Sequence, residues 1–543
     1  MKRLLICILV GIGISIPVVY FVDRQRVSSE LPAVVVRPPS RIPAGLSINT
    51  DRAFPGYSLL SPMNSTSTYL IDMDARVVRE WKSEFRPALS ACLLENGRLL
   101  RPALCPANGF NGPGTGGRIQ EFDWDGNLVW DFTLSTDRLH PHHDVCKLPN
   151  GNVLMIATDR KTKVEAIASG RLPAAVYEFM KPDCILEVKP TGLNTGEIVW
   201  EWHAWDHLIQ DYDDAKPNYG EPSEHPELIN VNFGASMMDT MLTDPQELNR
   251  LRSLGYVGGR APRKGPNGGF SKGDWMHTNS VAYNAEFDQI LISVYEFSEI
   301  WIIDHSTTTV EAASHAGGRS GKGGDLLYRW GNPLAYRRGE NKDQQLFVQH
   351  SAHWIPVGTP GAGHVLLFNN GTGRPQRTYS SVDELVLPVD SQGQYANRAD
   401  ESYLPEAAAW TYTTKQPTDF YSALVSGAQR LPNGNTLICS GIQRWVFEVA
   451  PEGEIVWQYR LPEGDKAVRP PHRDPAVGGQ TELDTTSDAK GLGGLFRCHR
   501  YATDYAGFAG KQLKAGPQLE DSIKLNTSKS SVPATDTDDS SSN

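Results

Sequence analysis

Histidines recur at three well-separated places in the sequence, in the stretches HPHHD from His140, DWMHTN from Asp274 and QHSAHW from Gln349. A neutral imidazole can attack an electrophilic centre as a nucleophile, and a protonated imidazole can donate a proton to a leaving group. Three histidines can also hold a catalytic zinc ion that keeps one coordination position open. We therefore take four histidines as candidate catalytic residues: His143, His277, His350 and His353.

An arginine ends the stretch FNNGTGR, which begins at Phe368. The planar guanidinium of Arg374 can bind two oxygens of one anion at once. An arginine beside the histidines would repel a cation, and only Asp144 and Asp274 add carboxylates to these motifs. We therefore favour catalysis without a metal over the zinc alternative.

Four more residues in or near these motifs could contact a substrate. Trp275 and Trp354 could line an apolar mouth for an aromatic molecule, although most tryptophans in a fold rich in strands belong to its core. Asn279 follows His277 by two positions. Arg444 could be a further anion ligand, or only an exposed strand residue.

Two strand–turn–strand patterns alternate along the chain and must position these residues. One appears as EFDWDGNLVWDF, EVKPTGLNTGEIVWEW and EVAPEGEIVWQY, with a Trp in the second strand of each copy. The other appears as HHDVCKLPNGNVLMI and YSALVSGAQRLPNGNTLIC, with the Asn-Gly turn of a β-hairpin. One copy of each makes four strands, so the sequence predicts an all-β fold, a β-propeller of about six four-stranded blades. An array of β-sandwiches is the alternative.

The propeller would explain why the histidines recur. The first strand of each blade lines the central channel, so residues at the starts of these strands converge at one end of the channel. The histidine motifs fall at this point of the repeat. We therefore expect one group of polar residues there: His142, His143, Asp144, His277, Asn279, His350 and His353.

The repeat also sets the expected domain boundaries. We expect the propeller over residues 59–461, with an insertion at 203–272 that shows helical periodicity from Leu248 to Leu254. This insertion could cap the channel mouth, or be a flap without substrate contact. The remaining segments are a linker at 28–58, a C-terminal extension at 462–515 and a disordered tail at 516–543.

The first 27 residues predict export of the rest of the chain. Lys2 and Arg3 precede an apolar run from Leu4 to Val22, an N-terminal apolar helix long enough to span a bilayer. We expect a signal anchor that tethers the protein to a membrane, with a cleaved signal peptide as the alternative. Either implies a periplasmic or other extracytoplasmic location.

Charge and cysteine content narrow the partners and the chemistry further. A net charge of −11 offers no basic surface for phosphates, so we expect no nucleic-acid partner. Outside the apolar run the chain has six cysteines. In an oxidising compartment Cys92 and Cys105 could form a local disulfide, or all six could be buried thiols.

Together, the motifs DWMHTNSV, QHSAHWI and FNNGTGR resemble those of the bacterial aryl-sulfate sulfotransferases, or arylsulfotransferases. The resemblance runs from about Leu59 to Leu461. It implies an exported six-bladed propeller that moves a sulfuryl group from a phenolic sulfate ester to a phenol, through a sulfated histidine and without a nucleotide donor or other cofactor. It also implies that His277, His350 and Arg374 hold the sulfate group, with His353 as an alternative match to His350.

The sequence departs from the family at one position. The family's nucleophilic histidine lies in the last blade, where this chain has CSGIQRWVFEV from Cys439, with Gln443, Arg444 and Trp445 near that place. The chain looks like a divergent branch in which His143 or His353 could replace the nucleophile. Direct transfer, hydrolysis, or a non-catalytic propeller that binds anionic molecules or a protein partner are the alternatives.

Overall fold

The computed structural model describes residues 42–105, 110, 113–176, 178–234, 245–256, 273–396, 401–462 and 492–523. All of them belong to the compact unit from Pro38 onward. The apolar run Leu4–Val22 lies outside the described residues, so the expected anchor stays a prediction. No helix in the described part of the chain is both long and apolar enough to cross a membrane.

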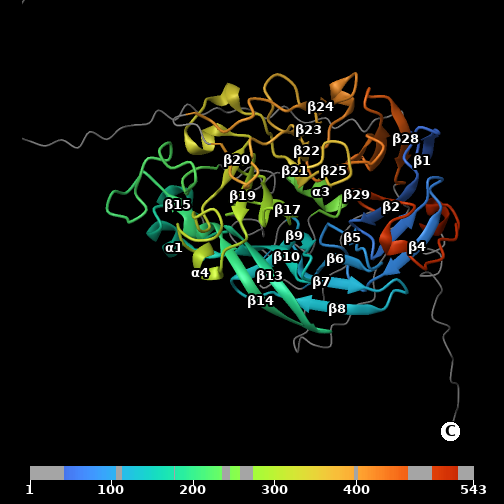
Figure 1. Cartoon of the computed structure of the whole chain (residues 1–543), viewed down its shortest axis with the longest axis horizontal. Coiled ribbons are helices and arrows are strands. Elements are labelled where there is room, and N and C mark those ends of the chain that lie inside the picture. Colours follow the sequence, from blue (N-terminus) through green and yellow to red (C-terminus); the bar gives the residue numbers. More distant parts are fainter. Residues whose placement is uncertain are drawn as a thin grey trace, which may run out of the picture. The chain divides into compact units, whose positions relative to one another are not determined.

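Six sheets, each with four or five antiparallel strands, form the blades of a β-propeller (Figure 1). From the innermost strand outward, the first three blades are β29 (Leu495–Ala502), β2 (Gly56–Pro62), β3 (Ser67–Ile71), β4 (Val77–Lys82); β5 (Cys92–Leu93), β6 (Leu99–Leu104), β7 (Gly117–Phe122), β8 (Leu128–Thr133); and β9 (Leu139–Lys147), β10 (Val153–Asp159), β13 (Asp183–Gly192), β14 (Thr195–His203).

The last three blades are β17 (Thr278–Asn284), β18 (Gln289–Val294), β19 (Glu299–Asp304), β20 (Tyr328–Trp330); β21 (His350–Trp354), β22 (Val365–Asn369), β23 (Ser381–Leu385), β24 (Trp410–Tyr412); and β25 (Gly427–Arg430), β26 (Thr436–Ser440), β27 (Trp445–Val449), β28 (Ile455–Arg460), with β1 (Gly45–Asn49) as a fifth, outermost strand. The predicted propeller of six blades is confirmed.

The ring is closed by strands from both ends of the described chain. β29 is the innermost strand of the first blade, where Gly56 pairs with Ala502 and Leu60 with Cys498. The structure therefore differs from the expected boundaries, because β1 lies in the expected linker and β29 in the expected extension. The sequence repeat could not predict β29 as a blade strand, because β29 forms no hairpin with a neighbouring strand in the chain. Leu519 and Ile523, in the expected disordered tail, are buried.

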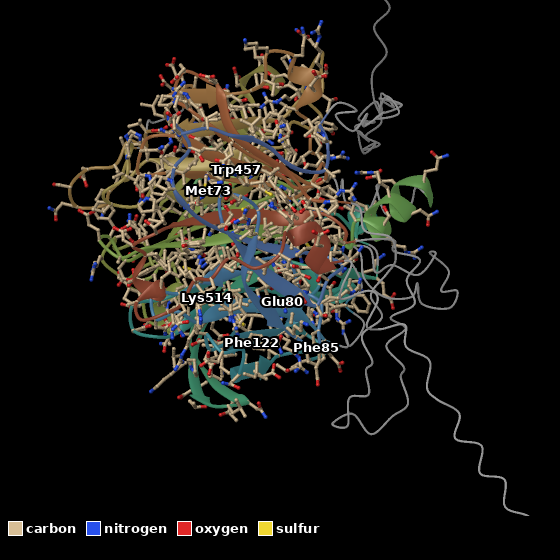
Figure 2. The ribbon with its side chains drawn as sticks, turned by 90° about the vertical axis from the view of Figure 1, so that its right-hand side faces the viewer. Met73, Glu80, Phe85, Phe122, Trp457 and Lys514 are labelled. Carbon is tan, nitrogen blue, oxygen red and sulfur yellow. The ribbon has the colours of Figure 1, made fainter. Side chains whose placement is uncertain are left out.

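The repeated tryptophans hold each blade to the next. Trp81 on β4 donates its indole N–H to the carbonyl oxygen of Asp123 in the second blade, 2.9 Å away. Trp130 on β8 bonds Thr195 O in the third blade at 3.0 Å. Trp457 on β28 bonds Met73 O in the first blade at 2.9 Å (Figure 2). A buried indole needs a partner for its N–H, so each Trp fixes a neighbouring turn as well as filling the core.

The six described cysteines are free thiols, so the disulfide between Cys92 and Cys105 is not formed. Cys92 lies opposite Leu100 in the β5–β6 pair, and Cys105 is five positions further along the chain than that partner. Their side chains are therefore too far out of register to be bridged. Burial raises the pKa of the Cys92 thiol to about 12, so this thiol is unreactive at neutral pH.

The insertion at 203–272 is partly helical, as expected. It contains η2 (Ala204–His207), β15 (Leu208–Ile209), β16 (Ile229–Asn230) and α3 (Pro245–Ser253). In Figures 1 and 2 the green helix α3 lies over the middle of the ring, on one of its faces. Other short elements outside the blades are β11 (Lys161–Thr162), α1 (Lys163–Ala168), η1 (Pro173–Ala175), β12 (Phe179–Met180), α4 (Thr309–Ala312), η3 (Pro333–Tyr336), η4 (Asn341–Asp343), η5 (Pro417–Asp419) and η6 (Ala506–Phe508).

A partly buried histidine links the third and fourth blades and makes stability depend on pH. His305 Nε2 lies 2.9 Å from Glu187 Oε2, and its Nδ1 lies 2.8 Å from Asp288 Oδ1. Burial alone lowers the pKa of His305, but the two carboxylates outweigh burial and raise it above the usual value. The stabilisation is therefore complete below about pH 6.5 and lost as pH rises through the higher folded-state pKa.

We expect His305→Gln to destabilise the protein most at about pH 6, and less as the pH rises towards about 9. Urea unfolding of both proteins across this range gives the difference in the free energy of unfolding. A difference that stays constant with pH would show that His305 is not charged in the folded protein.

Candidate functional site

Two parts of each blade meet at the same face of the ring, because successive strands run antiparallel. They are the start of the first strand and the connection between the second and third strands. His143 on β9, His277 just before β17 and His350 at the start of β21 lie on this face. Their rings form one group: the centroids of His143 and His277 are 4.6 Å apart, and Tyr295 lies within 5.6 Å of both His277 and His350. The predicted convergence of these three histidines is therefore present.

The inner strands are irregular where the histidines lie. His350 pairs with Phe368 and His353 with Leu366, so two residues of β21 stand opposite one residue of β22. His143 and His277 have φ angles of 58° and 53°, in the left-handed region that non-glycine residues seldom adopt. Such bulges and strained residues redirect side chains and often accompany functional sites.

A tyrosine from the insertion joins the two central histidines. The hydroxyl oxygen of Tyr256, three residues beyond α3, lies 2.8 Å from His277 Nε2 and 3.3 Å from His143 Nε2. Burial raises the pKa of Tyr256 well above its usual value, so the phenol keeps its proton. One residue of the insertion thus reaches the histidines, and two imidazole nitrogens there face one phenolic oxygen.

An aspartate orients His277. Asp274 Oδ2 accepts a hydrogen bond from His277 Nδ1 over 2.7 Å. Burial alone raises the pKa of Asp274, but His277 and Lys181 outweigh burial and hold it at about 2. The carboxylate is therefore ionised at neutral pH, and it fixes the proton of His277 on Nδ1. Nε2 is then free to take or give a proton at the phenolic oxygen.

A second chain of contacts orients His143. Asp183 Oδ1 lies 3.1 Å from His142 Nε2, and His142 Nδ1 lies 2.7 Å from His143 Nδ1. If Asp183 accepts the proton of a neutral His142, then His142 Nδ1 accepts the proton of His143, and His143 Nε2 keeps its lone pair. Burial, together with His277 and His142, lowers the pKa of His143 well below its usual value. His143 is therefore neutral at neutral pH, as a nucleophile must be.

His350 makes different contacts. Its Nδ1 donates to Asn370 Oδ1 over 2.7 Å, and its Nε2 accepts the backbone N–H of Val425 over 3.2 Å. Burial lowers its pKa to about 3. Both ring nitrogens are thus occupied, and His350 joins the fifth and sixth blades beside the other histidines.

The other predicted site residues lie around this group rather than within it. Arg374 donates to Ser381 Oγ over 2.8 Å, and within the described residues it has no hydrogen bond to the histidines. Trp275 is buried, with its indole N–H on Phe233 O, and Trp354 packs against the core. Asn279 joins β17 to β21 through Gln349 O. His353 donates to Ser351 O further along β21, and Arg444 lies in the β26–β27 turn.

Two positively charged side chains lie near the histidines, and the sequence motifs do not include either of them. Arg497 on β29 lies 2.9 Å from Asp144 Oδ2, and its charge helps to lower the pKa values of His143 and His350. Lys181 lines a small cavity of about 30 Å³ next to His277, together with Phe110, Pro113, Thr115, His140, His142, Thr158 and Asp274. Lys181 lies outside the repeat, and Arg497 belongs to the strand that the repeat does not reveal.

The sixth blade contributes no imidazole. The sequence has no histidine between His364 and His472. Gln443, which stands near the expected nucleophile position, accepts from Ser440 Oγ and donates to Asp419 O. The chain therefore departs in structure as well as sequence from the arrangement that the resemblance implies.

The fold and site define a β-propeller with a group of histidines at one end of its channel. Residues 106–466 match the arylsulfotransferase (ASST) family, and the chain belongs to that family. It is 24% identical over 340 residues to arylsulfate sulfotransferase AssT of Escherichia coli O6:H1, covering 61% of this chain and 50% of AssT. The chain thus spans about half the length of this curated relative.

Solved structures resemble this chain only weakly. A protein of unknown function from Bacteroides caccae is 13% identical, with 75% of this chain and 93% of that one covered and a TM-score of 0.38. A virginiamycin B lyase from Staphylococcus aureus is 8% identical, with coverages of 77% and 84% and a TM-score of 0.32.

Proposed function

We propose that this protein transfers a sulfuryl group from a phenolic sulfate ester to a phenol. The observation that supports this most directly is the position of Tyr256, whose phenolic oxygen lies between the Nε2 atoms of His143 and His277. A site that holds one phenolic oxygen between two imidazoles can hold the oxygen of a phenolic substrate once Tyr256 moves aside. Membership of the arylsulfotransferase family supports the same reaction class.

The two histidines differ in surroundings, and we assign them different roles. His143 Nε2, which is neutral because of burial, attacks sulfur as the nucleophile, and the bond between sulfur and the ester oxygen breaks. His277, starting as the imidazolium that Asp274 orients, donates its Nε2 proton to the departing phenolate and becomes neutral. In the second half, His277 takes the proton of the acceptor phenol, which attacks sulfur and frees His143. The reaction is balanced in protons.

Cations at the site would stabilise the sulfuryl oxygens. Sulfuryl transfer resembles phosphoryl transfer, in which fixed positive charges around the equatorial oxygens supply most of the catalysis. Lys181 borders the cavity next to His277, and Arg497 lies near His143 and His350. We assign these two side chains to the sulfate group. Arg374 would join them only if its bond to Ser381 Oγ breaks on substrate binding.

The first experiment is to incubate the protein with 4-nitrophenyl sulfate, with and without phenol. Transfer predicts release of nitrophenol that depends on phenol, with formation of phenyl sulfate. Release without any acceptor would indicate hydrolysis. No release with a panel of aryl sulfates would favour a propeller that only binds anionic molecules.

Asp274→Asn should lower kcat by about 10²- to 10⁴-fold, because an amide can donate to His277 Nδ1 and leave the wrong nitrogen protonated. The matched control is Asp288→Asn, because Asp288 makes the same kind of contact with His305, at 2.8 Å, within the fourth blade and outside the histidine group. Steady-state kinetics of both variants test the role of the pair. Equal losses in the two variants would point to stability instead of catalysis.

A further inference from the structure

A second cluster of metal-ligating side chains lies at the outer edge of the third and fourth blades. His207 ends η2, which follows the outermost strand β14, while His315 and Asp325 belong to the loop after α4. His207 Nδ1 and His315 Nδ1 each lie 2.8 Å from the same atom, Asp325 Oδ1. None of these residues belongs to the group of His143, His277 and His350 at the channel end (the channel site), and the proposed transfer reaction does not use them.

The surroundings of His207 fix which of its nitrogens has a proton. His207 is fully buried, and its Nε2 lies 2.8 Å from the carbonyl oxygen of Ala312, which can only accept. In the neutral ring the single proton is therefore on Nε2, and Nδ1 presents a lone pair to the carboxylate of Asp325. Two lone pairs 2.8 Å apart repel each other unless a positive charge lies between them.

The backbone at Gly324 also passes so close to His207 that no side chain fits there. A side chain at Gly324 would place its Cβ 2.0 Å from Ala312 O and 2.6 Å from His207 Nε2. Trp202 holds Gly324 in place through a 2.7 Å hydrogen bond to its carbonyl, and the Trp202 ring stacks parallel to that of His207. A histidine whose second nitrogen donates to a backbone carbonyl is the usual arrangement of a metal ligand.

We propose that His207, His315 and Asp325 bind a zinc ion through Nδ1, Nδ1 and Oδ1. Two imidazoles and one carboxylate form a ligand set typical of zinc sites that keep a fourth position open. The three ligand atoms lie within 4.8 Å of one another. Ligands of tetrahedral zinc lie roughly 3.3 Å apart, so the carboxylate would withdraw by about 0.5 Å from each imidazole.

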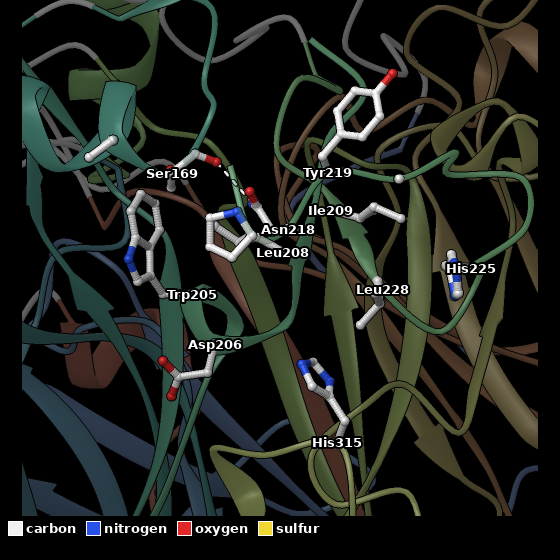
Figure 3. Close-up of a pocket in the computed structure, with 13 residues that line it drawn as sticks. Ser169, Trp205, Asp206, Leu208, Ile209, Asn218, Tyr219, His225, Leu228 and His315 are labelled. Atoms are coloured by element: carbon white, nitrogen blue, oxygen red, sulfur yellow. Dashed lines mark hydrogen bonds between the residues drawn. The ribbon is translucent and has the colours of Figure 1, made fainter. Parts of the chain in front are cut away.

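A neighbouring pocket gives the fourth position access to small ligands. His315 lines a pocket of about 450 Å³ together with Trp205, Leu208, Ile209, Tyr219 and Leu228 (Figure 3). The side chain of His315 is 62% exposed, so a metal bound there can be reached from solvent. A water molecule or an anion from the pocket would complete the coordination.

The test is zinc binding by the purified full-length protein, with any purification tag removed and bound metal stripped by a chelator. Competition with a fluorescent zinc indicator should give one high-affinity site per chain, with Kd below about 1 µM. Cobalt in place of zinc should give the visible absorption of a tetrahedral site. His315→Asn should weaken zinc binding at least tenfold and abolish that absorption, without changing Tm in the absence of metal.

His364→Asn is the matched control, because His364 also pairs with a carboxylate, Glu384, at 2.6 Å but, among the residues that the structure describes, belongs to no such cluster. This control variant should bind zinc with the same Kd as the protein without substitutions. Because His207 is fully buried and its variant could fail to fold, the conclusion rests on His315. Absence of tight zinc binding, or binding that His315→Asn leaves unchanged, would overturn the proposal.

Discussion

Replacing His143 by Asn is expected to lower kcat for sulfuryl transfer by at least about 10³-fold. Two imidazoles among the described residues face Tyr256, and the variant loses the one whose ring has no hydrogen bond to a carboxylate. It keeps a polar side chain of similar size. Rapid mixing with 4-nitrophenyl sulfate should show a burst of nitrophenol equal to the enzyme concentration in the unchanged protein. The burst should be absent from the variant, because no sulfated histidine forms.

The companion variant is His353→Asn, since the sequence leaves both histidines open as the nucleophile. His353 lies further along β21 and donates to Ser351 O. We expect it to keep the burst, with peptide mapping of the quenched enzyme placing the sulfuryl group on His143. Loss of the burst in His353→Asn alone would transfer the nucleophilic role to His353.

The largest expected loss of stability follows from Glu448→Gln. Glu448 on β27 forms an ion pair with Arg500 on β29, and both side chains are fully buried. Arg500 also bonds Ser58 Oγ on β2 and lies over the ring of Trp457. Removing the charge of Glu448 leaves the guanidinium buried without compensation, which costs about 3–5 kcal/mol.

Urea unfolding of this variant should show a lower midpoint with an unchanged slope. Glu454→Gln is the control, because Glu454 pairs with Arg52 on the surface and such pairs contribute little. The double variant Glu448→Gln, Arg500→Met should recover part of the loss, since it removes both charges. Equal midpoints for Glu448→Gln and the control would show that the pair of Glu448 and Arg500 does not stabilise the closed ring.

The sequence predicts the blades well because their signals are local. Each hairpin has its alternating strands and turn residues within about a dozen positions, and the repeats place the histidine motifs at the same point of successive blades. The convergence of His143, His277 and His350 could be predicted from this placement alone. The same reasoning could not show that His350 has both nitrogens occupied, since Asn370 and Val425 come from other segments.

The residues that the sequence does not reveal come from outside the repeat. Tyr256 belongs to an insertion, and its contact with His277 depends on how that insertion folds back over the channel. Arg497 lies on β29, whose partner strand β2 is far away in the chain; the bond from Arg500 to Ser58 spans 442 positions. No pattern within a short window of sequence reports such a pairing.

The closure of the ring by β29 has a consequence for when the protein becomes functional. Synthesis proceeds from the N-terminus, so one edge of β2 stays unpaired until β29 has been made. A pairing between such distant segments forms late and slowly. Phe496 and Arg497, on this last strand, border His143 and His350. The surroundings of these histidines are therefore complete only after β29 has paired, and a chain whose other blades have formed still lacks them.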